Sequence, residues 1–322
     1  MERLTFSSGL WVYGQVPDRY MPGGYKNLDD LKTRLTAARQ TLGGEGLELP
    51  YGPVLREDNY DEVVSLLREV GVKATSLTAN VTGDRKWGKG SITNPDPGIR
   101  EEAKNLIKQS MQAAKRMGVS VVNLWMGQEG FDYIFESDYC RLWESISQGV
   151  DECAKSCPEV KLSIEYKRME PRARNIPNSA AQALLLALEG NNENVGVTLD
   201  IGHAMMGGEN ASQSAVLLSK YGKLFNIHIN DNYADWDWDM IAGADHWWQL
   251  VEFCYYMQGL PYDESIVLDI FPYRQDAVRA AELSVKAFQK AWGIAEKLDR
   301  TAVAKAMEEQ DFMSVFEKLL NI

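Results

Sequence analysis

Four side chains of the kinds that bind divalent cations stand at or near the ends of four successive apolar runs of the chain. They are Glu165, Asp200, His228 and Asp269. Borderline and hard divalent metals prefer carboxylate and imidazole ligands that converge from separate pieces of chain. Each residue alone could be a hydrogen-bonded polar group at a strand end. Four in this order, in a chain with 3 histidines, favour a metal site, with Mn²⁺ expected and Mg²⁺, Co²⁺ or Zn²⁺ as alternatives.

A second acidic group lies close to the first along the chain. Asp237 and Asp239 alternate with Trp236 and Trp238 along the chain. His203 follows Asp200 by three positions. In an extended segment this alternation would place the carboxylates on one side and the indoles on the other. The carboxylates could then complete a second metal site with His203, so that each subunit would hold two ions. A solvated acidic loop would have the same composition.

Elements with the signature of parallel β/α units must position these residues. Short β-rich runs are predicted at Thr5–Val12, Gly46–Leu49, Lys73–Ala79, Ser120–Trp125, Leu162–Tyr166, Gly196–Asp200, Phe225–Ile229 and Ser265–Ile270. Helical patterns between and after them are predicted at Leu28–Leu42, Asp61–Val70, Arg100–Met117, Tyr139–Lys155, Ser179–Glu189, Ser212–Tyr221, Trp247–Met257 and Ala277–Leu298.

This alternation predicts an α/β fold of the (β/α)₈ TIM-barrel type. The barrel domain is expected to span residues 1–298, with a C-terminal helical extension at 299–322. The segments that follow the predicted strands are long, and in such barrels these loops build the active-site face. The four metal-binding candidates would therefore meet at one mouth of the barrel.

The composition excludes some classes of partner. The chain has 322 residues and a net charge of −12, which disfavours nucleic acid and anionic membranes. Its longest apolar stretch, Ala180 to Leu188, is too short to span a bilayer. The first residues lack the pattern of a secretory signal, and the 4 cysteines form no CxxC pair. A cytoplasmic protein with reduced thiols is expected.

The motifs around these residues resemble those of the xylose isomerase-like TIM-barrel superfamily, and within it most closely the L-rhamnose isomerase-type sugar isomerases. The resemblance runs from about Phe6 to Ala280. The segments that carry it are Glu165–Lys167 with Glu170-Pro171, Asp200–His203, His228–Asn232, Asp237–Gly243 and Leu268-Asp269. The chain differs in its shorter length and in the extra tryptophan of its aspartate loop, which leaves the particular sugar open.

The resemblance implies a specific role for each of the candidate site residues. Glu165, Asp200, His228 and Asp269 would hold one metal ion. His203, Asp237 and Asp239 would help to hold a second ion with its catalytic water. Lys167 would contact a substrate oxygen near C1 or C2, so the expected catalytic residues are Lys167, Asp237 and His203. The resemblance also implies a homo-oligomer, either a dimer or a tetramer.

The expected activity is an aldose–ketose isomerisation of an open-chain monosaccharide by a metal-assisted hydride shift. The first alternative is a ketose 3-epimerase, which needs two carboxylates on either side of one carbon. The resembling epimerases carry Glu where this chain has Asp269, which favours the isomerase. Another metal-dependent sugar-transforming enzyme of the superfamily is a further alternative. An apurinic endonuclease would need a basic groove, and a non-catalytic sugar-binding barrel would not need Lys167.

Aromatic and polar residues in the long loops are candidates for sugar contacts, because carbohydrate C–H faces stack on indoles. The candidates are Trp87, Trp125, Gln128, His246 and Trp236. Each tryptophan could instead pack in the upper layer of the barrel, and His246 could simply cap the helix that follows it. The basic, Gly-rich segment 82–93 lacks the spacing of a phosphate-binding loop.

Overall fold

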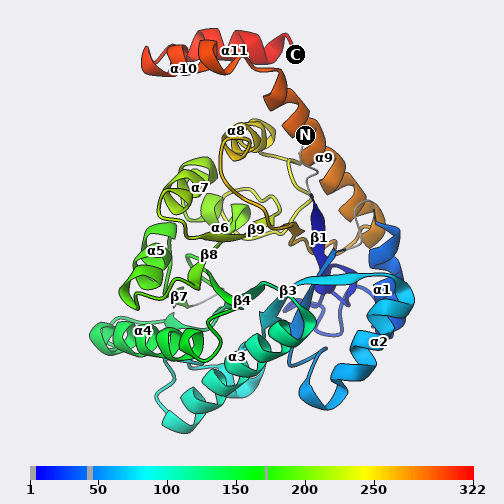
Figure 1. The fold of residues 1–322 in the computed structure, drawn as a ribbon, viewed down its shortest axis with the longest axis vertical. Coiled ribbons are helices and arrows are strands. Elements are labelled where there is room, and N and C mark those ends of the chain that lie inside the picture. Colours follow the sequence, from blue (N-terminus) through cyan, green and yellow to red (C-terminus); the bar gives the residue numbers. More distant parts are fainter. Residues whose placement is uncertain (1–4, 42–45, 171–172) are drawn as a thin grey trace.

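The computed structural model describes residues 5–41, 46–170 and 173–322. Within these residues, parallel strands close into a barrel surrounded by helices, which confirms the predicted fold class (Figure 1). In order around the barrel, the strands are β1 (Phe6–Gly9), β10 (Ile266–Leu268), β9 (Leu224–Ile229), β8 (Val195–Asp200), β6 (Lys161–Glu165), β4 (Val121–Trp125), β3 (Lys73–Ala79) and β2 (Gly46–Tyr51). A separate antiparallel pair joins β5 (Gly130–Phe131) to β7 (Arg174–Asn175).

Helices connect the barrel strands and cover their outer faces. They are α1 (Leu31–Gln40), α2 (Tyr60–Val70), α3 (Pro97–Met117), α4 (Tyr139–Lys155), α5 (Ala180–Glu189), α7 (Ala211–Lys220), α8 (Trp247–Met257) and α9 (Ala277–Lys297). Their ends follow ordinary capping chemistry. In α3, Asp96 caps the first turn, Pro97 occupies the first helical position and Gly118 ends the helix with a φ of 71°. The one-turn helix α6 (Ile201–Met206) directly follows β8.

The first predicted strand, Thr5–Val12, is too long. The strand β1 ends at Gly9, and the chain then turns through the 3₁₀ segment η1 (Leu10–Tyr13), where Gly14 N donates to Trp11 O at 2.9 Å. Apolar residues such as Leu10 and Val12 satisfy a buried turn as well as a buried strand, so the apolar pattern does not mark this boundary.

The ends of other predicted elements also differ from the structure, for example those of the last strand and the first helix. The last strand stops at Leu268, so Asp269 lies just beyond the end of β10. The first helix begins at Leu31 because Asp30 caps it through Thr33 N. Its predicted end at Leu42 lies outside the described residues.

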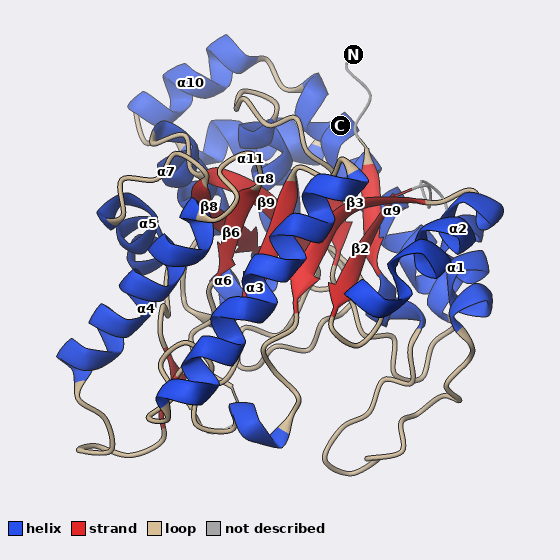
Figure 2. Ribbon diagram, turned by 60° about the horizontal axis from the view of Figure 1, so that its bottom comes forward, coloured by secondary structure: helices blue, strands red, loops and turns tan. Residues whose placement is uncertain are grey.

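The long loops and the C-terminal helices lie on opposite sides of the barrel. In Figure 2 the strand arrowheads point down toward the loops, whereas α10 (Arg300–Glu308) lies at the upper end. The helices α10 and α11 (Phe312–Leu320) form the predicted helical extension (Figure 1). Among the described residues, no helix combines the length and apolarity required to cross a bilayer.

Candidate metal centre

The four metal-binding candidates meet at the carboxyl-terminal mouth of the barrel. One ligand atom from each of Glu165, Asp200, His228 and Asp269 lies within 4.8 Å of every other. Glu165 ends β6, Asp200 ends β8, His228 lies in β9 and Asp269 follows β10. These strands are neighbours in the barrel, so their ends bring side chains to a common point.

The imidazole of His228 lies at the centre of this group. Its Nδ1 atom is 3.0 Å from Asp269 Oδ2, 3.5 Å from Glu165 Oε1 and 3.9 Å from Asp200 Oδ2. The side chain is fully buried. One ring nitrogen therefore faces all three carboxylates at once, which is the arrangement expected around a single bound cation.

Two of the carboxylates are oriented by the backbone and by neighbouring amides. Asp200 Oδ1 accepts from His203 N at 2.8 Å and so caps α6, while Oδ2 lies toward His228. Asn230 Nδ2 donates to both oxygens of Asp200, at 3.2 and 3.0 Å. Glu165 Oε2 accepts from Asn123 Nδ2 at 2.6 Å, while Oε1 lies toward His228. Each carboxylate thus has one oxygen directed to the common point.

A second cluster adjoins the first and is centred on Asp237. Its Oδ2 atom is 2.8 Å from Lys167 Nζ and 3.1 Å from His203 Nε2. The other nitrogen of His203, Nδ1, donates to Tyr166 O at 3.0 Å, which fixes the ring orientation. Lys167 also pairs with Glu170, the last described residue of the Glu170-Pro171 motif. Pro171 lies outside the described residues.

Asp239 joins this cluster from the same loop. Asn230 Nδ2, which binds Asp200, also donates to Asp239 Oδ1 at 3.4 Å. The backbone of Asp239 has a φ of 46°, in the left-handed region that few residues other than glycine adopt. The loop is braced on both sides of this residue, because Met240 N donates to Asp231 O at 2.8 Å and Phe271 N donates to Asp239 O at 2.9 Å.

The clustered charges shift the pKa values of these groups in opposite directions. Burial disfavours a charged Glu165, but the nearby His228 and His203 outweigh burial and lower its pKa to about 2. Burial raises the pKa of Asp200 to about 7, with the carboxylates of Asp237, Asp269 and Glu165 adding to the effect against His203. Burial would lower the pKa of His203, but Asp200 and Asp237 raise it to about 9. Such opposed shifts are typical of functional sites.

The pKa of Lys167 is raised and the pKa of Asp237 is lowered because the two opposite charges lie next to each other. Burial would lower the pKa of Lys167, yet Asp237, Glu170 and Asp239 raise it above its ordinary value. Burial would raise the pKa of Asp237, yet Lys167 and His203 hold it well below its usual range. Lys167 is therefore a buried ammonium, 6% exposed, that keeps its charge at neutral pH.

The residues present fit a divalent cation. Three carboxylates and one imidazole are the oxygen and nitrogen donors that Mn²⁺, Mg²⁺, Co²⁺ and Zn²⁺ accept. Oδ1 of Asp237 is buried and has no hydrogen-bond partner among the described residues. An unpartnered buried carboxylate oxygen is costly unless a ligand satisfies it. The second cluster therefore also offers a donor that the protein itself leaves unused.

The structure places the other predicted contact residues at different depths. Trp125 ends β4, with Lys167 Nζ 5.5 Å from its ring centroid and its buried Nε1 without a partner among the described residues. Trp236 is half-buried in the aspartate loop, and Gln128 is exposed. His246 precedes α8, and its Nδ1 lies 2.9 Å from Oδ1 of the buried Asp231. Their contacts with a sugar stay predictions.

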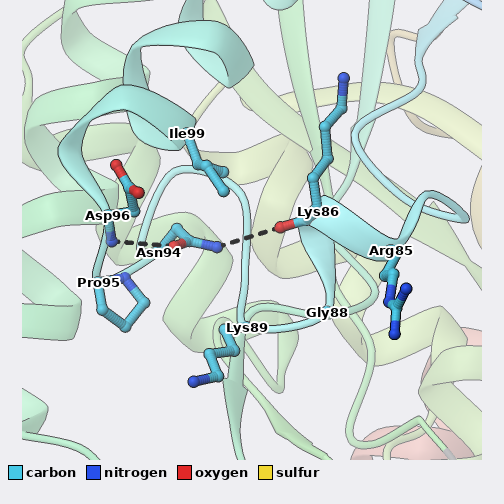
Figure 3. Close-up of a pocket in the computed structure, with 8 residues that line it drawn as sticks. All are labelled: Arg85, Lys86, Gly88, Lys89, Asn94, Pro95, Asp96 and Ile99. Carbon is cyan, nitrogen blue, oxygen red and sulfur yellow. Dashed lines mark hydrogen bonds between the residues drawn. The ribbon is translucent and has the colours of Figure 1, made fainter.

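Trp87 is a buried residue of the loop between β3 and α3. It is 2% exposed and ends the 3₁₀ turn η3 (Arg85–Trp87) in the β3–α3 loop. A hollow of about 530 Å³ opens on the surface beside this turn, between Lys86 and the start of α3 (Figure 3). None of the four ligands lines this hollow. Its walls come in part from the basic segment 82–93 and in part from residues 94–99 at the start of α3.

Besides Asn123, two residues contact the candidate ligands in ways that the sequence did not predict. Glu48, in the middle of β2, lies 3.3 Å from Nε2 of His228. Trp11, in η1, donates from Nε1 to Asp269 Oδ1 at 2.6 Å. The signal for Glu48 was present, because a carboxylate inside a predicted parallel strand must be buried. No sequence signal marked the contact of Trp11.

The fold and the clustered ligands define a TIM barrel with a candidate metal centre at its mouth, and comparison with known proteins gives the family. Residues 36–292 match the family model described as xylose isomerase-like TIM barrel. The chain belongs to this family, as its motifs predicted.

Two curated relatives carry the name xylose isomerase. The protein from Ruegeria pomeroyi is 28% identical over 190 residues, which cover 56% of this chain and 44% of that protein. The protein from Thermus thermophilus is 25% identical over 260 residues, which cover 76% of this chain and 66% of that protein. The chain thus spans less than two thirds of the length of either relative. The narrower resemblance to L-rhamnose isomerase-type enzymes stays a prediction.

A solved structure shares the fold over almost the whole chain. The structure of an L-ribulose 3-epimerase superposes with a TM-score of 0.70 at 13% identity, covering 92% of this chain and 96% of that chain. At this identity the match establishes the barrel architecture and its connectivity.

Proposed function

We propose that this protein is a divalent-cation-dependent aldose–ketose isomerase that acts on an open-chain monosaccharide. The observation that carries the proposal is the contact between buried Lys167 and Asp237, 2.8 Å apart, beside the four convergent ligands. A permanently charged ammonium next to a cation site suits a reaction in which negative charge develops on a sugar oxygen.

The ligand sets assign residues to the cations. Glu165, Asp200, His228 and Asp269 would hold one ion, and His203, Asp237 and Asp239 would hold the second. The donor chemistry favours Mn²⁺, with Mg²⁺, Co²⁺ or Zn²⁺ as alternatives. When bound, such ions act as Lewis acids on the vicinal oxygens of the sugar.

Lys167 would donate a hydrogen bond from Nζ to the carbonyl oxygen at C1. As hydride passes from C2 to C1, negative charge grows on O1, and the ammonium would stabilise it. Asp237 would accept the proton of the C2 hydroxyl, which O1 finally receives. His203 and Lys167 hold its Oδ2 in place, which leaves Oδ1, without a partner among the described residues, to face the substrate. The buried indole Nε1 of Trp125 would donate to a sugar hydroxyl.

A ketose 3-epimerase is the second candidate. Glu165 and Asp269 both lie against Nδ1 of His228, at 3.5 and 3.0 Å, so two carboxylates are available at one site. An epimerase would use one to remove the C3 proton and the other to return it. The L-ribulose 3-epimerase fold is compatible with this reading. However, both oxygens of Asp269 already have partners, Trp11 at Oδ1 and His228 at Oδ2. A carboxylate held in this way suits a fixed metal ligand better than a base.

An isotope experiment separates the two candidates. Aldoses labelled with deuterium at C2 are incubated with the Mn²⁺-loaded protein, and the products are examined by NMR. The isomerase should give a ketose that retains the label at C1, because hydride moves within the substrate. A parallel incubation with ketoses labelled with deuterium at C3 tests the alternative, because an epimerase would give C3 epimers that carry hydrogen from the solvent at that carbon. A lack of turnover of both pentoses and hexoses, with each of the four ions, would contradict the proposal.

The assembly and location of the protein also stay proposals. A dimer or tetramer is expected from the family, and sedimentation at several protein concentrations tests it. A cytoplasmic location is expected from the sequence.

A further inference from the structure

The buried carboxylate of Glu48 has no role in the chemistry proposed above. Glu48 occupies the middle of β2, opposite Gly9 of β1 and Ser76 of β3 in the ladder, and its side chain is fully buried. A carboxylate inside a barrel costs free energy unless hydrogen bonds or an opposite charge compensate it. Its partners therefore indicate why a charge is placed there.

Glu48 connects β2 with β3 and with β9 across the barrel interior. Oε1 accepts from the hydroxyl of Thr78, and Oε2 accepts from Ser76 Oγ at 2.5 Å. The same Oε2 lies 3.3 Å from His228 Nε2 and 3.3 Å from Asn226 Nδ2. The amide of Asn226 also lies 3.1 Å from His228 Nε2. The one basic side chain among these contacts is a candidate metal ligand.

The contact with Glu48 decides how the two nitrogens of His228 are used. A carboxylate is only an acceptor, so the contact between Nε2 and Glu48 is a hydrogen bond when Nε2 carries the proton. The amide of Asn226 donates to the same Oε2, and so lies beside a protonated Nε2 without donating to it. The opposite nitrogen, Nδ1, faces the oxygens of Asp269, Glu165 and Asp200. The ring is thus held with its donor edge toward β2 and its ligand edge toward the candidate cation site.

We propose that Glu48 is a positioning residue for the metal centre, fixing the tautomer and orientation of His228 so that Nδ1 binds the cation. The inference rests on the cation site of the proposed function. Carboxylates that accept from the distant N–H of a ligating histidine raise its basicity, and their loss weakens metal binding about 10- to 100-fold in other proteins. Glu48 provides this contact from a strand that contributes no ligand itself.

A purely structural role would make a different prediction. The hydroxyl contacts of Ser76 and Thr78 tie β2 to β3, and this function needs only an acceptor of the right shape. Glu48→Gln keeps an acceptor oxygen and the length of the side chain but removes the negative charge. If the contact served packing alone, this variant would change the unfolding temperature and leave cation affinity as it is.

The test measures Mn²⁺ binding directly, by counting free Mn²⁺ with electron paramagnetic resonance. Glu48→Gln should weaken the dissociation constant about 10- to 100-fold. The matched control is Glu129→Gln, which alters another buried carboxylate, 1% exposed, that accepts from Ser91 and Thr93 in the β3–α3 loop. The control should bind Mn²⁺ as the wild type does. The ligand-field bands of the Co²⁺-loaded protein should shift in the first variant and not in the second.

The outcomes are distinguishable. Unchanged Mn²⁺ affinity and Co²⁺ bands in Glu48→Gln would overturn the inference and leave the proposed function intact. If wild-type protein bound no Mn²⁺, the proposed function would fail with it. If Glu48→Gln did not fold, Glu48→Asp would replace it, because it keeps the charge but draws it away from His228. That variant should weaken Mn²⁺ binding relative to Glu129→Asp, and equal affinities would again overturn the inference.

Discussion

The indole Nε1 of Trp11 donates a hydrogen bond of 2.6 Å to Oδ1 of Asp269, which joins the first turn after β1 to the residue that follows β10. The other oxygen of Asp269, Oδ2, lies 3.0 Å from Nδ1 of His228. Trp11 therefore occupies one oxygen of this carboxylate and leaves the other for the candidate cation site.

Trp11→Phe should weaken cation binding while preserving the fold. Phenylalanine keeps much of the ring packing but cannot donate, so Asp269 Oδ1 loses a hydrogen bond of about 1 kcal/mol, or roughly fivefold in affinity. Titration with Mn²⁺ measures the change. Trp143→Phe is the control, because Trp143 Nε1 donates to Glu189 on the outer surface. Equal affinities for the two variants would show that Trp11 does not orient the ligand.

Removal of a proposed ligand should abolish stabilisation by the cation. At a concentration 100 times its dissociation constant, a bound ion stabilises a protein by about 2.7 kcal/mol, which for a chain of this size raises the melting temperature by roughly 5 °C. The chelated wild type should recover this increase when Mn²⁺ is added back. Asp269→Asn and His228→Ala should lose both the increase and the turnover. Full activity of either variant after chelation and add-back would refute the assignment.

Lys167→Met should reduce turnover far more than substrate binding. The side chain would keep its apolar stem but lose the ammonium that we place on the developing oxyanion, a loss worth about 10²–10³ in kcat. Steady-state kinetics at saturating Mn²⁺ separate kcat from KM. Lys104→Met, which removes a lysine paired with Glu101 and Glu152 on the outer helices, should leave kcat unchanged. An equal effect of the two substitutions would remove Lys167 from the mechanism.

The chelated protein should lose stability as the pH rises from about 6.5 to 9. The pKa of His203 is raised to about 9 from an ordinary 6.5, so its contribution is complete below pH 6.5 and is lost as the pH passes 9. The raised pKa of Asp200, about 7, acts in the same direction at lower pH. Melting temperatures in EDTA at half-unit pH steps test this sign. His203→Asn should flatten the decline, and a wild-type melting temperature that rises through this window would contradict the argument.

The sequence predicted the parts of the site that depend on strand ends. Glu165, Asp200 and His228 lie on their predicted strands because continuous apolar runs define buried parallel strands well. Asp269 was predicted inside the strand Ser265–Ile270, whereas β10 ends at Leu268, one residue before it. The order of strands in a barrel then brings these side chains together without further information.

The contacts behind the ligands could not be predicted in the same way. Trp11 reaches Asp269 because η1 turns the chain back toward the barrel mouth, and apolar periodicity does not distinguish this turn from a longer strand. Glu48 reaches His228 across the barrel interior, a distance set by barrel closure and not by local sequence. Asn123 is similar, since its role depends on β4 lying beside β6. Local patterns specify elements, whereas such pairs require the three-dimensional arrangement.

The bond from Glu48 to His228 has a consequence for the order of folding events. It ties β2 to β9, which lie on either side of the closing pair β1 and β10. Loop closure over such sequence separations is slow compared with helix formation. Uptake of Mn²⁺ during renaturation should therefore lag behind the recovery of helical circular dichroism. The ion would then bind to a barrel that has already closed. It would stabilise the folded barrel and would not initiate its folding.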